Sequence, residues 1–322
     1  MDQPNENILN FYVAGNENKY KIAKEHYPRD YSVAEVTVLA CLDALFRHDY
    51  LEEGQKDYDV HKVIRMIILD SIKDHLHLLN GSHKYDDIMK ELYDNESKEA
   101  KLARVSVYNT MIGFQGDNEE LNTLLKQFST LQTQIRSGHK LWAAKGDRIE
   151  SDLEHIYGTL LLTLGVESEY GYSVDFDEIL ETMLIHETDE ITIGDPTEFD
   201  GYTPEERRML ADNAVLRIFG KTKNGKHYIN LLKGFEEKQE LKNQYEHLID
   251  KLEYVMQVKM YQMQGRYDFE HRPMNVATQS KSVLDIIENG ANDTFEVHYQ
   301  YDKHRFRDIP CLRRVLEVTR NL

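Results

Sequence analysis

The sequence predicts an all-α protein. Apolar residues recur at helical spacing through most of the chain, as in the run Val38, Leu39, Leu42, Leu45 and Phe46. Residues that commonly begin helices precede several of these runs. No long stretch alternates between apolar and polar residues, as a half-buried strand would. We therefore expect a bundle of helices without a sizeable sheet.

The composition is typical of a globular protein that does not bind a nucleic-acid polymer. Of the 322 residues, 40% are hydrophobic and 30% are charged, and the formal net charge is −18. A protein that binds a nucleic-acid backbone needs a basic surface, so this charge argues against such a partner. A small phosphorylated substrate needs only a metal ion and one or two basic side chains.

The cysteines and the apolar runs point to the cytoplasm. Cys41 and Cys311 lie far apart in apolar helical patterns, so we expect two buried thiols and no disulfide. No apolar run approaches the roughly 20 residues of a membrane span. The first residues also lack the basic-then-apolar order of a signal peptide. We expect a cytoplasmic protein without a membrane partner.

In the first half of the chain, residues 32–70 predict two antiparallel helices, and residues 117–135 predict one more, which we expect to stop near Gly138. A polar connector over residues 139–147 follows and carries the only tryptophan, Trp142. We place a domain boundary here, which divides the chain into residues 1–133 and residues 134–322.

The second half has its own signals for helix starts. Ser151 or Asp152 can cap one helix, Asp175 begins a capping box for another, and Thr203 with Pro204 begins a third. Helical spacing returns over residues 245–256, and a final helix is expected over residues 310–320. We expect the tail after Arg266 to wrap back onto the helical body, and a surface for a partner is the alternative.

The ten residues from His186 to Asp195 contain one imidazole and four carboxylates. They follow an apolar run that predicts a buried helix. Adjacent His186 and Glu187 at the end of this helix can offer a nitrogen and an oxygen to one metal ion. If the helix continues, Glu190 lies on the same face and supplies a carboxylate for proton transfer. The alternative is an acidic helix end on the surface.

Two distant segments complete a pattern with this stretch. They are Ser151-Asp-Leu-Glu154-His155 and, after Phe235-Glu236-Glu237, Asp250-Lys251-Leu252-Glu253. The order His, His-Glu, Glu and Asp on predicted helices resembles the HD superfamily of metal-dependent phosphohydrolases. Within it, the chain is most similar to the 5′-deoxynucleotidase-like branch. The resemblance covers about residues 136–261.

This resemblance implies a site. One divalent ion per chain would be held by His155, His186, Glu187 and Asp250, and this ligand set suits Co, Mn, Fe, Ni or Zn. Glu190 would carry a proton, and Asp195 would assist it or orient water. The substrate-binding residues implied by the resemblance are Arg136, Trp142 and Arg148. Trp142 can instead be an ordinary buried anchor, and Arg148 can instead pair with Glu150.

Glu187 departs from the family pattern, which has aspartate at this position. Glutamate is still an oxygen ligand, but it is one methylene longer. Two hypotheses therefore stay open. The first is a phosphohydrolase that acts on a nucleoside monophosphate, and the second is a nucleotide-sensing or scaffold protein that has lost catalytic rate. A homodimer is compatible with both.

Residues 32–70 echo residues 151–187. Ser32 and Glu35 align with the serine and glutamate before His155, but the metal positions would be Val36, Leu69 and Asp70, with Lys73 in place of Glu190. Because two of these three ligands are lost, we interpret residues 1–133 as a degenerate HD-like copy that holds no metal. An unrelated helical domain is the alternative. A strand anywhere within residues 32–70 would end the repeat interpretation.

Overall fold

The structure, a computed structural model, describes residues 3–171, 174–197 and 199–322. In these ranges it has sixteen α-helices and a single small sheet, in which the antiparallel strands β1 (Ile22–Lys24) and β2 (Tyr31–Ser32) pair. The predicted all-α fold class is therefore confirmed. No helix of the described ranges is both long enough and apolar enough to cross a membrane.

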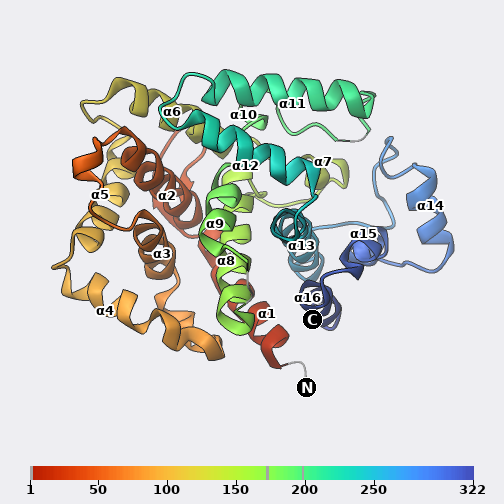
Figure 1. The fold of residues 1–322 in the computed structure, drawn as a ribbon. Helices are drawn as coiled ribbons and strands as arrows, with labels where there is room; N and C mark the ends of the chain where they lie inside the picture. Colours follow the sequence, from red (N-terminus) through yellow and green to blue (C-terminus); the bar gives the residue numbers. More distant parts are fainter. Residues whose placement is uncertain (1–2, 172–173, 198) are drawn as a thin grey trace.

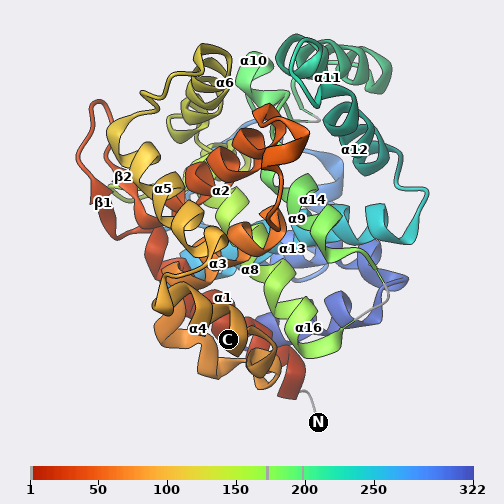
Figure 2. The same ribbon diagram turned by 60° about the vertical axis from the view of Figure 1, so that its left-hand side comes forward.

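Three helices lie in the middle of the molecule, between helices from an early and a late part of the chain (Figures 1 and 2). The central helices are α8 (Asp152–Tyr170), α9 (Phe176–Ile185) and α13 (Leu241–Met263). Helix α1 (Gln3–Asn16) lies at the lower end of α8 in Figure 1 and packs against α8 and the C-terminal helix α16 (Pro310–Arg320). On one side are α2 (Val33–Tyr50), α3 (Val60–Ser71), α4 (Asp86–Asp94), α5 (Lys98–Ile112) and α6 (Glu119–Ser129). On the other side are α14 (Lys281–Glu288), α15 (Thr294–Asp302) and α16.

Four further helices lie above the central ones in Figure 1. These are α7 (Ser137–Leu141), α10 (Glu190–Ile193), α11 (Pro204–Phe219) and α12 (Gly225–Glu237). The predicted caps are confirmed at three helix starts, because Ser151, Asp175 and Thr203 all accept hydrogen bonds from backbone amides of the following turn. At Asp175 the structure shows this cap without the reciprocal hydrogen bond of the predicted capping box. Pro204 occupies the start of α11, as its sequence position predicts.

One hydrophobic core runs through both halves of the chain. It extends from Ile8 in α1 to Leu316 in α16, and α8 lies within it with almost every residue buried. Helices α1, α2, α9 and α13 all pack against α8, so this helix has no solvent-facing stripe. Both cysteines are buried and free, as expected. The division into residues 1–133 and 134–322 stays a prediction, since the two parts share this core.

The segment between the halves differs from the prediction. The expected helix over residues 117–135 is wrong at its end, because α6 stops at Ser129 and is followed by a short 3-10 turn. The hydroxyls of Ser129 and Thr130 donate to carbonyls three residues earlier, and such bonds compete with the helical pattern. Gly138 does not stop a helix but lies inside α7. The expected polar connector begins with His139, which is in this helix and fully buried.

The predicted repeat has matching helix starts. Ser32 forms a capping box with Glu35 at the start of α2, and Ser151 forms one with Glu154 at the start of α8. The expectation of no strand within residues 32–70 is wrong at its first residue, since β2 ends at Ser32. Ser151 likewise forms an isolated bridge, with Ile135. This short strand counts against the tandem repeat, which is not confirmed.

The starts of α2 and α8 contact each other reciprocally, and we call this contact the arginine junction. Arg29 donates to Glu154 Oε2 at 2.6 Å, and Arg148 donates to Glu35 Oε2 at 2.8 Å. Each arginine also donates to the backbone carbonyl of the residue that follows the other arginine, at 2.9 and 3.0 Å. Each one precedes the capping serine of its own helix by three residues.

Candidate metal centre and active site

Four buried side chains bring their ligand atoms together at the centre of the molecule. His155 comes from α8, His186 from the residue after α9, Glu187 from the next residue and Asp250 from α13. One ligand atom from each lies within 4.8 Å of all the others. His155 Nε2 is 3.1 Å from Asp250 Oδ1 and 3.3 Å from His186 Nε2. The structure thus assembles all four predicted metal ligands.

A turn, rather than a continuing helix, presents this group. Helix α9 ends at Ile185, and the hydroxyl of Thr188 donates to the Ile185 carbonyl within the turn that follows. A new short helix, α10, then begins at Glu190 and ends at Ile193, and it is followed by Gly194, whose φ of 75° suits glycine. The expectation that the helix continues through Glu190 is wrong, but the turn still carries Glu190 to the site.

The outer nitrogens of both histidines face acceptors. His155 Nδ1 is 2.5 Å from Glu253 Oε2, and His186 Nδ1 is 2.9 Å from the Met183 carbonyl. With a proton on each Nδ1, both Nε2 atoms direct a lone pair at the same point as the two carboxylate oxygens. Four converging lone pairs repel one another unless a cation lies between them. The donor set therefore fits a divalent ion of the borderline class.

The pKa shifts of the ligand side chains also indicate that this site stabilises a positive charge. Burial and the charge of Arg136 disfavour a charged His155, yet Glu253 and Asp250 raise its pKa to about 10. Burial opposes the charge of Glu187, but Arg136 and His186 bring its pKa well below the usual value. Burial likewise opposes the charge of Asp250, and Lys251 and His155 lower its pKa. A metal ion and a proton on His155 would therefore compete for the site.

A second group of carboxylates adjoins the first, with oxygens of Asp152, Glu190 and Asp195 within 4.8 Å of one another. Burial and the charge of Glu187 raise the pKa of Glu190 well above its usual value. Burial also raises the pKa of Asp152 to about 8, against the opposing charge of Arg136. Glu190 Oε2 and both Asp152 oxygens are buried without a hydrogen-bond partner among the described residues. Glu190 is thus suited to carry a proton at neutral pH.

Arg136 lies between the two groups of acidic residues. Its Nη1 is 2.6 Å from Glu187 Oε1 and 3.4 Å from Glu190 Oε1. The next residue, Ser137, donates its hydroxyl to the Asp195 carbonyl at 2.7 Å and its amide to the Asp195 carboxylate. Asp195 therefore fixes the backbone that carries Arg136, in addition to bordering Glu190.

A cavity of about 730 Å³ opens from these residues. Trp142 lines it, although only 5% of this side chain is exposed, and packs edge-on against His298. Arg148 does not reach the cavity. It is held in the arginine junction, so the geometry gives no support to a substrate-binding role, and its partners are Glu35 and Glu154 rather than Glu150.

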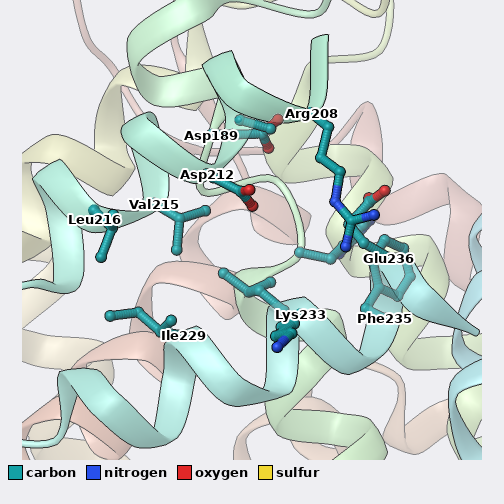
Figure 3. Close-up of a pocket in the computed structure, with 12 residues that line it drawn as sticks. Asp189, Arg208, Asp212, Val215, Leu216, Ile229, Lys233, Phe235 and Glu236 are labelled. Atoms are coloured by element: carbon teal, nitrogen blue, oxygen red, sulfur yellow. The ribbon is translucent and has the colours of Figure 1, made fainter. Parts of the chain in front are cut away.

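A smaller cavity of about 300 Å³ lies between α11 and α12 and also touches His186 (Figure 3). One end of it is apolar, with Val215 and Leu216 from α11 and Ile229 from α12. Arg208 extends from α11 towards Phe235 and Glu236, which line both cavities.

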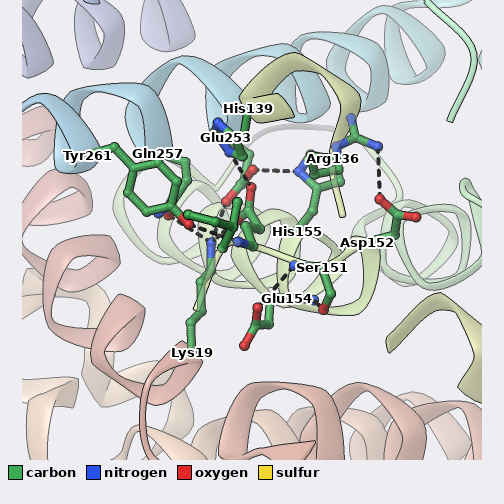
Figure 4. Close-up of polar contacts among 12 residues, drawn as sticks. Lys19, Arg136, His139, Ser151, Asp152, Glu154, His155, Glu253, Gln257 and Tyr261 are labelled. Atoms are coloured by element: carbon green, nitrogen blue, oxygen red, sulfur yellow. Dashed lines mark hydrogen bonds and ion pairs between the residues drawn. The ribbon is translucent and has the colours of Figure 1, made fainter. Parts of the chain in front are cut away.

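Sequence reasoning missed the groups that support His155 (Figure 4). Glu253 stands in a matched motif, one turn after Asp250, so its spacing was an available signal. Lys19 donates to Glu253 at 2.7 Å and to Glu150 at 2.5 Å, and all three side chains are buried. Lys19 lies 234 positions before Glu253, so no local pattern could have indicated this contact.

Comparison with known families agrees with this site. The profile described as HD domain matches residues 128–289, about half of the chain and the part that contains all four converging ligands.

The chain belongs to the HD domain family.

HD domains generally are metal-dependent hydrolases, and the buried histidine and carboxylate cluster accords with the binding of a divalent metal. Membership thus indicates a metal-dependent phosphohydrolase type of function. The match does not distinguish branches of the family, so the 5′-deoxynucleotidase-like branch stays a prediction. No curated protein matches the sequence.

Proposed function

We propose that this HD domain protein is a metal-dependent phosphohydrolase that hydrolyses a nucleoside monophosphate. The observation that carries the proposal is the convergence of four buried metal-ligand side chains next to Glu190, a buried carboxyl group whose pKa burial and the charge of Glu187 raise well above its usual value. Both border a cavity of about 730 Å³, a size typical of sites for small molecules.

His155, His186, Glu187 and Asp250 would hold the ion. When bound, Co, Mn, Fe, Ni or Zn would neutralise phosphoryl oxygens and lower the pKa of a water molecule. Arg136 would contribute a positive charge to the same phosphate. Glu190 would donate its proton from Oε2 to the leaving oxygen, and Asp195 would hold α7 and Arg136 in register with it.

The test is a phosphate-release screen over nucleoside monophosphates with each of these metals, together with elemental analysis of protein purified without chelator. We expect one ion per chain and metal-dependent release from at least one substrate. Protein that stays free of metal after loading with Co or Mn would show that the ligand assignment is wrong.

A nucleotide-sensing or scaffold role is the second candidate. The observation that favours it is the 2.6 Å contact between Arg136 and Glu187, which occupies an oxygen of the residue that departs from the family pattern. This candidate predicts that calorimetry detects nucleotide binding while no metal supports phosphate release.

A further inference from the structure

One wall of the large cavity gathers positive charge. Lys238 follows α12, Lys251 lies on α13 and Arg305 lies in the 3-10 turn after α15, and all three line the cavity. Three cations on one wall are unexpected in a chain whose formal net charge is −18. Like charges repel in a partly desolvated site, so an anion that binds between them is stabilised.

Lys238 has the least compensated charge of the three. Lys251 Nζ is 3.0 Å from Asp250 Oδ2, and Arg305 Nε is 2.7 Å from Asp302 Oδ1, whereas Lys238 forms no ion pair with the described residues. Burial and the charges of Lys251 and Arg305 lower the pKa of Lys238, although Glu236 acts in the opposite direction.

The backbone and a neighbouring histidine add to this arrangement. Lys238 has a φ of 54°, a left-handed conformation that few residues other than glycine and asparagine adopt, so its position next to the cavity is fixed by the end of α12. His247 lies one turn before Lys251 on α13 and lines the same wall. Its buried Nδ1 has no hydrogen-bond partner among the described residues.

We propose that Lys238, Lys251 and Arg305 form an anion subsite on this wall, and that the subsite takes a phosphate group of the substrate. Arg305 belongs to the tail beyond residue 289, outside the family match. The tail therefore completes the substrate cavity instead of serving only to cover the helical body. The proposal rests on the proposed function for the nature of the substrate, but the subsite can be tested without turnover.

The test uses inorganic phosphate and metal-free protein, because a bound metal would itself attract phosphate. Trp142 is the only tryptophan and lines the cavity, so its fluorescence reports binding. Lys238→Asn removes the charge and keeps a residue that tolerates the left-handed backbone. Arg305→Gln is the second variant. Lys226→Gln, an exposed lysine of α12 outside the cavity, is the matched control.

We expect each cavity variant to bind phosphate roughly tenfold more weakly than wild type, as for the loss of one charge-assisted hydrogen bond. Lys226→Gln should bind as wild type does. Equal phosphate affinity in wild type, Lys238→Asn and Arg305→Gln would overturn the proposal. Weakened phosphate binding in a protein that hydrolyses no substrate would support the subsite and refute the proposed hydrolase.

Turnover then identifies which phosphate occupies the subsite. If Lys238→Asn raises KM equally for a nucleoside monophosphate and a nucleoside bisphosphate, the subsite holds the phosphate that is hydrolysed. A KM raised for the bisphosphate alone assigns it to a second phosphate. Unchanged KM for both substrates would contradict the proposal.

Discussion

At the scale of single residues, a substitution of Glu190 tests catalysis independently of metal binding. Glu190 lies beside the four metal-ligand residues, burial and the charge of Glu187 raise its pKa, and one of its oxygens forms no hydrogen bond to the described residues. We expect Glu190→Gln to lower kcat by about 10²–10⁴-fold, the usual contribution of a general acid, with metal content unchanged. Steady-state kinetics and elemental analysis measure the two effects. Glu270→Gln, an exposed residue outside both cavities, is the control, and a fully active Glu190→Gln would refute the hydrolase.

Glu187 tests whether the site has adapted to a longer ligand. Its Oε1 is 3.3 Å from the Nε2 atoms of both histidines and 2.6 Å from Arg136. Aspartate would withdraw this oxygen by one methylene from all three groups. We expect Glu187→Asp to weaken metal binding roughly tenfold or more, as changes around metal ligands do, and Glu187→Ala to lose both metal and activity. Metal titration followed by calorimetry measures the affinity, and tighter binding by Glu187→Asp would show that the site still prefers the family residue.

Lys19 links the N-terminal half to His155. Lys19→Met would leave the buried carboxylates of Glu150 and Glu253 without their cation, and uncompensated buried charges of this kind cost about 3–5 kcal/mol of unfolding free energy. We expect this loss in urea unfolding, together with weaker metal binding, since Glu253 orients His155. Adding Glu253→Gln to Lys19→Met should restore part of the stability. If Lys19→Met were as stable as wild type, the buried ion pairs of Lys19 would make no net contribution to the free energy of unfolding.

At the scale of elements, one carboxylate connects three helices. Glu181 of α9 has Oε1 2.6 Å from His61 Nε2 of α3 and Oε2 2.5 Å from His227 Nε2 of α12. Burial opposes the charge of Glu181, but hydrogen bonds from His227 and His61 lower its pKa to about 2. The hydrogen bond to Glu181 raises the pKa of His227, and, against burial, that of His61. Asp177 and Asp59 also face His61, and Asp49 faces His227.

The pKa shifts of Glu181, His61 and His227 predict how the stability provided by their contact depends on pH. The raised histidine pKa values give stability below the ordinary value of about 6.5, and it is lost as the pH rises through the folded values. The lowered pKa of Glu181 gives stability above about 4.5, and it is lost as the pH falls towards 2. We expect Glu181→Gln to lower the free energy of unfolding by about 1–3 kcal/mol between about pH 4.5 and about pH 6.5, and by less at alkaline pH. Urea unfolding at several pH values measures this, with exposed Glu270→Gln as control, and a loss independent of pH would contradict the account.

The helices and the metal ligands were predictable because their signals are local. Ser151, Asp175 and Thr203 lie next to the amides that they cap, and His155, His186 and Asp250 stand in short motifs. The turn before Glu190 was missed because helical spacing alone continues through it. Lys19, the arginine junction and the cationic wall of the cavity depend on contacts between distant segments, which no sequence window contains.

At the scale of the whole molecule, the shared core governs how the protein unfolds. The core runs from α1 to α16 without a break at residue 133, and Lys19 and the arginine junction cross that position. We expect one calorimetric transition whose van't Hoff and calorimetric enthalpies agree. Two separate transitions would instead show that residues 1–133 and 134–322 are independent domains.

Because both sides of the arginine junction belong to one chain, its formation does not depend on protein concentration. A contact in which both sides offer the same residues is the kind that joins two subunits about a twofold axis. A dimer held this way dissociates on dilution, but here both sides belong to one chain, so the effective concentration is fixed by the connecting polypeptide. The start of the helix that carries His155 therefore keeps its partner at any protein concentration and always in a ratio of one to one.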